Sequence, residues 1–232
     1  MPISKNALPN HILIIPDGNR RWAKEHNKSL SEAYNYALST VTTNLIEFLL
    51  IQNKIENLSI YMLSKNNLVK RNKNELSPIL ENEIKVFKEW KNNERFLKFD
   101  IKFNFIIGTR LLPKKYLKAT HELVEKTKNN TAKICNLLIG YDAETEIENT
   151  INKLLMNKKI KKLHDIKKYL ELKDAIDLII RTGKEKRLSG CPMIQSAYAE
   201  IFFLDEYYPD LNSELLKNVL EEFIQRKRRY GE

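Results

Sequence analysis

The sequence predicts an α/β fold: one domain built on an open, mainly parallel sheet of about six strands flanked by helices. Short apolar runs alternate with stretches whose apolar residues recur at helical spacing, and parallel strands need such long crossovers. No internal repeat or Pro/Gly-rich linker divides the 232 residues. Hydrophobic residues make up 42% of the chain, which is enough for a packed core. We therefore expect residues 1–232 to form a single domain.

The first part of the chain predicts two strands and a long helix. Residues 11–16 form a short apolar run that ends in Pro-Asp-Gly, the pattern of a buried strand entering a tight turn. Apolar residues at helical spacing predict a helix over residues 30–52. A second strand is predicted over residues 58–63, and the polar stretch 64–74 predicts a loop after it.

The rest of the chain continues this alternation. Helices are predicted over residues 75–91, 113–128, 143–157, 160–172 and 212–228, and strands over residues 101–107, 133–140, 175–180 and 199–204. In open α/β sheets, ligands bind outside the carboxyl ends of the strands. Functional side chains are therefore expected just after Pro16, Leu63, Gly140 and Ile180.

The charge of the chain allows three kinds of partner. The formal net charge of +10 fits nucleic acid, an anionic membrane surface or a phosphorylated substrate. Lysine-rich stretches such as residues 158–168 are typical of a solvated surface, and no nucleic-acid motif with interleaved aromatic residues is present. We expect no nucleic-acid partner and leave peripheral contact with a membrane open.

Several absences predict a cytoplasmic protein. The apolar runs are far shorter than the roughly 20 residues that span a bilayer, and residues 1–5 do not form a secretory signal. The two cysteines, Cys135 and Cys191, lack the spacing of metal ligands and fit a reducing compartment.

The first chemical motif is Pro-Asp-Gly-Asn-Arg-Arg-Trp at residues 16–22. Backbone N–H groups at a helix start, reinforced by Arg20 and Arg21, suit a phosphate, and Asp17 could hold Mg²⁺ against that phosphate. The alternative is a capped turn in which Asp17 is an N-cap and Trp22 a core anchor.

The second motif follows the predicted strand at residues 175–180. Arg181, Arg187 and Ser189 suit a diphosphate, because its oxygens accept forked guanidinium hydrogen bonds. The alternative is a solvated basic loop.

Two further segments carry polar groups at strand positions. Glu200 interrupts an apolar run and therefore needs a cationic partner, a metal or a place on an edge strand that faces water. Ser64 and Asn67 follow the second strand, where they could hydrogen-bond a substrate or a catalytic aspartate, or form an ordinary turn.

Taken together, these segments resemble the cis-prenyltransferases, the family typified by undecaprenyl diphosphate synthase. The resemblance runs from residue 11 to residue 231 and includes Asp-Gly-Asn-x-Arg-Trp-Ala, Arg-Thr-Gly-x-Glu-x-Arg-x-Ser, Tyr-Ala-Glu and the terminal Arg-Arg-Tyr-Gly. It implies a hydrophobic tunnel between helices and sheet, a homodimer, and Mg²⁺-dependent coupling of an allylic diphosphate with a second prenyl diphosphate.

The resemblance also implies roles for individual residues. Asp17 and Asn67 would be catalytic, and Asp17 and Glu200 would bind Mg²⁺. The residues implied in substrate binding are Gly18, Asn19, Arg20, Arg21, Trp22 and Ser64, together with Arg181, Arg187 and Ser189 for the second diphosphate, and Arg229 and Gly231 at the partner subunit's site.

Some positions depart from the usual family pattern. Arg20 replaces a glycine, Leu30 and Tyr34 replace an arginine and a histidine, and residues 65–68 and 140–144 lack the usual Ser-Glu-Asn-Trp and Asn-Tyr-Gly-Gly-Arg. The changes at residues 20, 30 and 34 are similar to cyclolavandulyl diphosphate synthase and, more loosely, to tuberculosinyl-transfer enzymes. They favour an irregular, head-to-middle coupling over regular cis-polyprenyl synthesis from isopentenyl diphosphate.

Two other functions fit the same family. A transferase or phosphatase that acts on one prenyl diphosphate needs only one diphosphate site, whereas Arg181, Arg187 and Ser189 argue for a second. A non-catalytic partner subunit would typically lack the catalytic aspartate, whereas Asp17 is present.

Overall fold

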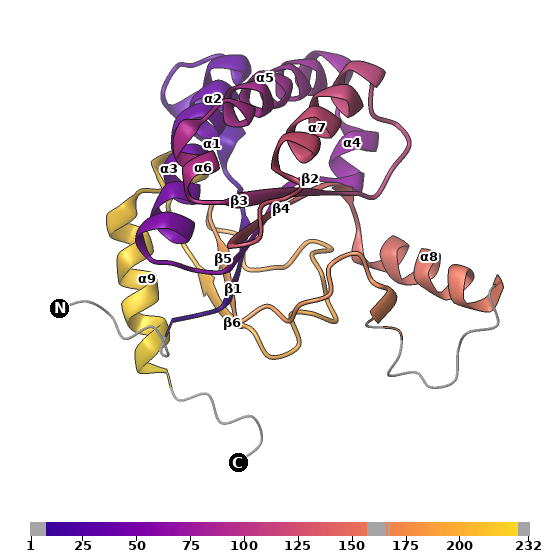
Figure 1. The fold of residues 1–232 in the computed structure, drawn as a ribbon. Coiled ribbons are helices and arrows are strands. Elements are labelled where there is room, and N and C mark those ends of the chain that lie inside the picture. The colour runs from indigo at the N-terminus through magenta and orange to yellow at the C-terminus, as the bar shows by residue number, and fades with distance from the viewer. Residues whose placement is uncertain (1–7, 157–165, 167, 227–232) are drawn as a thin grey trace.

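The computed structural model describes residues 8–156, 166 and 168–226, and these form an open sheet with helices packed against it (Figure 1). The six strands are β1 (His11–Ile15), β2 (Asn57–Ser64), β3 (Ile101–Ile107), β4 (Lys133–Tyr141), β5 (Leu178–Arg181) and β6 (Glu200–Phe203). Their order is β3-β4-β2-β1-β5-β6, and every pairing is parallel. The predicted fold class is therefore confirmed.

The helical elements connect these strands. They are α1 (Asn19–Glu25), α2 (Leu30–Tyr36), η2 (Ala37–Thr42), α3 (Thr43–Ile46), η3 (Glu47–Gln52), α4 (Lys65–Lys70), α5 (Lys73–Lys91), α6 (Glu94–Lys98), α7 (Lys114–Thr127), α8 (Ala143–Met156), η5 (Tyr208–Asp210) and α9 (Ser213–Gln225). In Figure 1, α8 extends away from the body of the domain. None of the helices in the described ranges combines the length and the apolar character that crossing a bilayer requires.

The sheet has a different covering on each face. Ile12 and Ile14 of β1 belong to a large core that includes side chains of the helices α5, α7 and α9. Leu13 and Ile15, which alternate with them, pack in a smaller core with Cys191 and other residues of the later part of the chain. Both faces of the central strand are thus buried, as its continuous apolar run predicts.

Register places the carboxyl ends of the central strands at one edge. Ile15 pairs with Arg181 of β5, and Ile14 pairs with Ile60 of β2. Asp17 and Thr182, which follow β1 and β5, and Ser64, the last residue of β2, therefore lie at the same edge of the sheet.

Three predicted segments differ from the structure or lie partly outside its described residues. The polar stretch 64–74 is mostly helical, because Ser64 caps α4 by accepting the Asn67 N–H at 3.0 Å and Asn72 caps α5. The strand predicted at residues 175–180 begins only at Leu178, since the Asp177 carboxylate accepts backbone N–H groups from the start of β1. Of the helix predicted at residues 160–172, residues 160–165 and 167 lie outside the described part, and residues 170–172 form bends.

The long helix predicted over residues 30–52 exists but contains two π-helical turns. In η2, the Thr42 hydroxyl donates to the Ala37 carbonyl at 2.7 Å and lies 2.8 Å from the Tyr208 hydroxyl. Such turns change the direction of the side chains and are frequent at functional sites. Here they help to direct Ala37, Leu38 and Thr42 toward a cavity described below.

One carboxyl group is buried among the helices. Glu83 of α5 is 1% exposed and accepts the Tyr116 hydroxyl at 2.6 Å. Burial raises the pKa of Glu83 to about 7, although Tyr116 and Arg71 favour its charged form. The folded chain therefore binds a proton here that the unfolded chain has already released near pH 6.

This raised pKa gives Glu83→Gln a pH-dependent effect on stability. Glu83 contributes most favourably below its unfolded pKa and becomes costly as the pH rises through about 7. Glu83→Gln should therefore increase the free energy of unfolding by about 1–3 kcal/mol at pH 8 and by much less at pH 5. Urea unfolding at the two pH values measures this.

Glu146→Gln is the matched control. Glu146 is also buried and accepts the Tyr141 hydroxyl at 2.7 Å, but it accepts backbone N–H groups as well. Its substitution should therefore give no gain at pH 8. An equal gain from both variants, or a gain from Glu83→Gln that is the same at both pH values, would contradict the assignment.

Candidate active site

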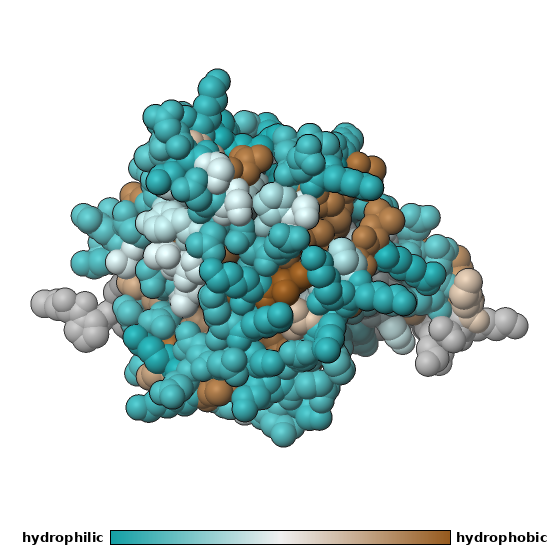
Figure 2. All heavy atoms as spheres, turned by 90° about the horizontal axis from the view of Figure 1, so that it is seen from above, coloured by the Kyte–Doolittle hydropathy of each residue, from teal (hydrophilic) through white to brown (hydrophobic). Residues whose placement is uncertain are grey.

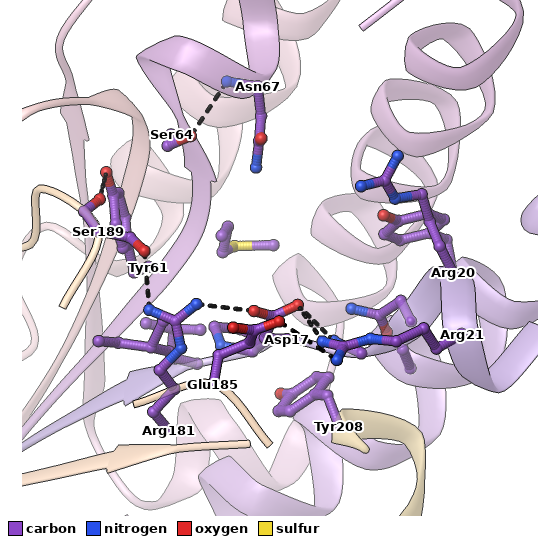
Figure 3. A pocket seen from close by; sticks show the side chains of 18 of the residues that line it. Asp17, Arg20, Arg21, Tyr61, Ser64, Asn67, Arg181, Glu185, Ser189 and Tyr208 are labelled. Atoms are coloured by element: carbon purple, nitrogen blue, oxygen red, sulfur yellow. Dashed lines mark hydrogen bonds and ion pairs between the residues drawn. The ribbon is translucent and has the colours of Figure 1, made fainter. Parts of the chain in front are cut away.

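A cavity of about 890 Å³ opens at the carboxyl edge of the sheet (Figure 3). Residues after β1, β2 and β5 line it together with side chains of α1, α2, η2 and α5. Cavities of this size hold small-molecule ligands in many enzymes. This cavity therefore lies where functional side chains were expected after Pro16, Leu63 and Ile180, whereas the residues after Gly140 do not line it.

Asp17 lies at the centre of an ion-pair network. Its Oδ2 accepts a hydrogen bond from Arg181 at 2.7 Å, and its Oδ1 accepts from Arg21 at 3.3 Å. Its backbone is tied to β5 as well, since the Thr182 hydroxyl donates to the Asp17 carbonyl and accepts the Asp17 N–H, each at 2.9 Å. The network joins the first and second sequence motifs.

Gly18 allows the chain to turn tightly after Asp17. Its φ is +98°, and a Cβ at this position would lie 2.5 Å from the Tyr207 ring. Asn19 begins α1 and is buried, and its Oδ1 has no hydrogen-bond partner among the described residues. Both residues line the cavity.

Arg181 is the most buried cation of the site. Its side chain is 3% exposed, and it donates to Ser189 Oγ at 2.8 Å and to the Arg187 carbonyl. Its Nε has no partner among the described residues. A buried guanidinium needs anionic or strongly polar partners, which Asp17, Ser189 and the loop after β5 supply.

Arg187 and Arg21 share a second carboxylate. The Glu185 side chain pairs with Arg187 and lies 3.4 Å from Arg21. Arg187 is 62% exposed, so its side chain can reorient toward a ligand at low cost. Arg20 is also exposed, at 61%, and lies 3.8 Å from Glu75.

The end of β2 contributes a third side of the cavity. Ser64 and Asn67 both line it, with Ser64 engaged in capping α4. Tyr61, Lys70 and Arg71 line it too. The Tyr61 hydroxyl donates to the Tyr141 carbonyl at 3.0 Å, and burial raises the pKa of Tyr61.

Several predicted site residues do not meet at this cavity. Trp22 does not line it; its Nε1–H donates to Asp210 at 2.7 Å, and its ring stacks on His26. Glu200 is the first residue of β6, which puts it roughly 10 Å of strand before the level of Arg181. Arg229 and Gly231 lie outside the described residues.

Glu200 has the partner that its position requires. Arg226 donates to Glu200 at 2.8 Å and lies 3.8 Å from the Phe202 ring centroid. Among the described residues, Glu200 therefore has a cation as its partner. It does not lie beside Asp17, as a metal site shared by the two carboxylates would require. Arg226 lies in the segment that the sequence predicted only as the closing helix, residues 212–228.

Other lining residues had no predicted role. The charged residues and tyrosines among them are Lys24, Tyr61, Lys70, Arg71, Glu83, Glu185 and Tyr208. Glu185 lies within the second sequence motif, and Arg71 is one of several cations in the segment after the second predicted strand. Among the lining residues, Arg and Lys outnumber Asp and Glu by seven to three, which suits an anionic ligand.

Asp17 is the residue that fits Mg²⁺. No group of three or more His, Cys, Asp or Glu side chains in the described ranges forms a metal cluster. Mg²⁺ commonly binds through one or two carboxylates and the phosphates of a substrate. The Asp17 carboxylate, 32% exposed and at the cavity, matches that pattern.

Comparison with known sequences identifies relatives over nearly the whole chain. A family model described as "Putative undecaprenyl diphosphate synthase" matches residues 15–231. A tritrans,polycis-undecaprenyl-diphosphate synthase (geranylgeranyl-diphosphate specific) of Sulfurisphaera tokodaii is 34% identical, covering 99% of this chain and 90% of the relative. An isoprenyl transferase of Fusobacterium nucleatum is 31% identical, covering 97% and 96%.

Solved structures share the fold. Lavandulyl diphosphate synthase from Lavandula x intermedia, in complex with dimethylallyl diphosphate, superposes with a TM-score of 0.88 at 24% identity, over 98% of this chain and 100% of that one. A "probable undecaprenyl diphosphate synthase" from Campylobacter jejuni gives 0.80 at 28% identity, over 97% and 99%. With its site, its fold and these relatives, the chain belongs to the undecaprenyl diphosphate synthase family of prenyltransferases.

Proposed function

We propose that this prenyltransferase couples an allylic prenyl diphosphate with a second prenyl diphosphate. The observation that carries the proposal is the position of Asp17 between two cationic groups. Arg20 and Arg21 lie on the α1 side, and Arg181 and Arg187 lie on the β5 side. Two diphosphates could therefore bind side by side, with one carboxylate between them.

Coupling requires the allylic C–O bond to break as a new C–C bond forms. The electron pair leaves with the diphosphate, the alkene of the second substrate attacks the allylic carbon, and a proton is lost from the product cation. Arg20, Arg21 and the Asn19 amide would stabilise the charge on the departing diphosphate. Arg181, Arg187 and Ser189 would orient the second diphosphate.

Asp17 would hold Mg²⁺ between the two diphosphate sites. Asn67 would form a hydrogen bond with a substrate or with the Asp17 carboxylate. Bound Mg²⁺ supplies positive charge to the leaving group. Ala37, Leu38, Ile60 and Met62 form an apolar wall of the cavity, which would keep water away from the reacting carbon.

The coupling we propose is irregular, with two allylic units joined head to middle. Arg20, Leu30 and Tyr34 support it, because they replace residues of the chain-elongating pattern, and Arg20 and Tyr34 line the cavity. Regular cis-polyprenyl synthesis is the second candidate, favoured by the names of the relatives at 29–34% identity. A homodimer, with Arg229 and Gly231 at the partner subunit's site, remains a prediction for sedimentation analysis.

Product analysis separates these functions. Purified protein with Mg²⁺ is incubated with dimethylallyl, geranyl, farnesyl or geranylgeranyl diphosphate, each with and without isopentenyl diphosphate. Mass spectrometry follows dephosphorylation of the products. We expect a product from allylic diphosphate alone; a strict requirement for isopentenyl diphosphate would establish regular elongation instead. A bare alcohol, or no product, would support the one-substrate or non-catalytic function.

Asp17→Asn should reduce kcat by about 10²-fold or more, because it removes the proposed metal ligand and its charge. The variant should have a lower free energy of unfolding, because the buried Arg181 loses its anionic partner. Circular dichroism at the assay temperature would verify that kcat is measured on folded protein. Asp210→Asn is the matched control, since Asp210 binds Trp22 outside the cavity and its loss should leave turnover near that of the wild type. Normal product formation by Asp17→Asn would refute its role.

Arg187→Ala should affect the two substrates unequally. We expect the KM of the second prenyl diphosphate to rise about tenfold or more, and that of the allylic substrate to change by less than about threefold. Lys186→Ala, in the same loop but outside the cavity lining, is the control. Equal losses for both substrates would indicate one shared diphosphate site.

A further inference from the structure

A buried carboxyl group lines the cavity that contains the proposed hydrocarbon site. Glu83 lines the cavity yet is 1% exposed, and it is anchored by Tyr116, which is itself fully buried. Tyr116 in turn packs edge-on against Phe87 in the main core. Glu83 thus sits where the cavity meets the packed interior of the domain.

A second polar pair lies close to this carboxyl. Arg71 donates to the Tyr34 hydroxyl at 2.8 Å, and both residues line the cavity. Glu83 lines the same cavity, so the three groups share one region. The cavity is therefore lined by apolar residues of η2 and β2 and also by polar side chains from α2, α5 and the α4–α5 connection.

A long hydrocarbon chain is poorly matched to such a lining. A chain that fills the cavity would have to lie against the Glu83 carboxyl and remove its remaining access to water. Burying a polar or charged group against hydrocarbon is costly unless it keeps a hydrogen-bonding partner, and Tyr116 satisfies only one of the two carboxyl oxygens. A short chain would stop on the apolar wall and avoid this cost.

We propose that Glu83 ends the hydrocarbon part of the cavity and restricts the allylic substrate to one or two isoprene units. This chain-length limit rests on the proposed function. It separates this chain from relatives whose names specify geranylgeranyl diphosphate.

The test measures binding without turnover. Wild-type protein, Glu83→Leu, Glu83→Gln and the control Glu146→Gln are titrated by calorimetry at pH 8 with Mg²⁺. The ligands are thiolodiphosphate analogues of dimethylallyl, geranyl, farnesyl and geranylgeranyl diphosphate, whose bridging sulfur resists cleavage.

We expect wild-type protein to bind the geranylgeranyl analogue about tenfold or more weakly than the geranyl analogue. Glu83→Leu should remove that difference and leave dimethylallyl binding within about threefold of wild type. Glu83→Gln should change the profile in the same direction by a smaller factor, which keeps the test valid if Glu83→Leu does not fold. Glu146→Gln should retain the wild-type profile.

Two results would overturn the proposal in different ways. Equal or tighter binding of the geranylgeranyl analogue by wild type, or an unchanged length profile in folded Glu83 variants, would overturn the chain-length limit alone. Failure of every analogue to bind would overturn the proposed function, and the chain-length limit with it.

Discussion

The ion pair between Arg181 and Asp17 is the interaction on which the rest of the site depends. A guanidinium that is 3% exposed, at the end of a central strand, would be strongly destabilising without an anion beside it. Asp17 supplies that anion at 2.7 Å, and the loop after β5 adds the Ser189 hydroxyl and the Arg187 carbonyl. One buried charge thereby fixes the relative positions of two loops that are separated by 164 residues in sequence.

The Arg181–Asp17 pair also explains how the cavity can contain many cations whose side chains are already held in position before a ligand binds. Glu185 has a similar effect on the outer side, where it lies between Arg21 and Arg187. Each carboxylate lies between two guanidinium groups and offsets their mutual repulsion before any phosphate binds. A diphosphate would then exchange one anionic partner for another, and the arginines would need little rearrangement.

Much of the fold and part of the site could be predicted from the sequence. The alternation of apolar runs and helical patterns yields the parallel sheet, and its strand ends bring Asp17, Arg21, Arg181 and Ser189 together.

Trp22 could not be assigned in this way, because one more step around α1 turns its side chain toward Asp210. Glu200 does not reach the cavity, because it is the first residue of β6. The first residue of a parallel strand lies at the amino edge of the sheet, and the cavity opens at the opposite, carboxyl edge. Glu83 is one polar residue among many in α5, and only the packing of Tyr116 and the cavity against it reveals its position.

The π-helical turn at Ala37–Thr42 has a consequence for how this family could diversify. A π-helical turn accommodates one residue more than an α-helical turn, so the deletion of a single residue within η2 would restore α-helical hydrogen bonding and leave α2 and α3 facing much as they do now. Only the side chains of the turn itself, among them Ala37 and Leu38, would then change places in the cavity wall, while the sheet and the arginines at its edge stayed in place. A change of one codon in length, rather than a series of substitutions, would thus reshape the proposed hydrocarbon site.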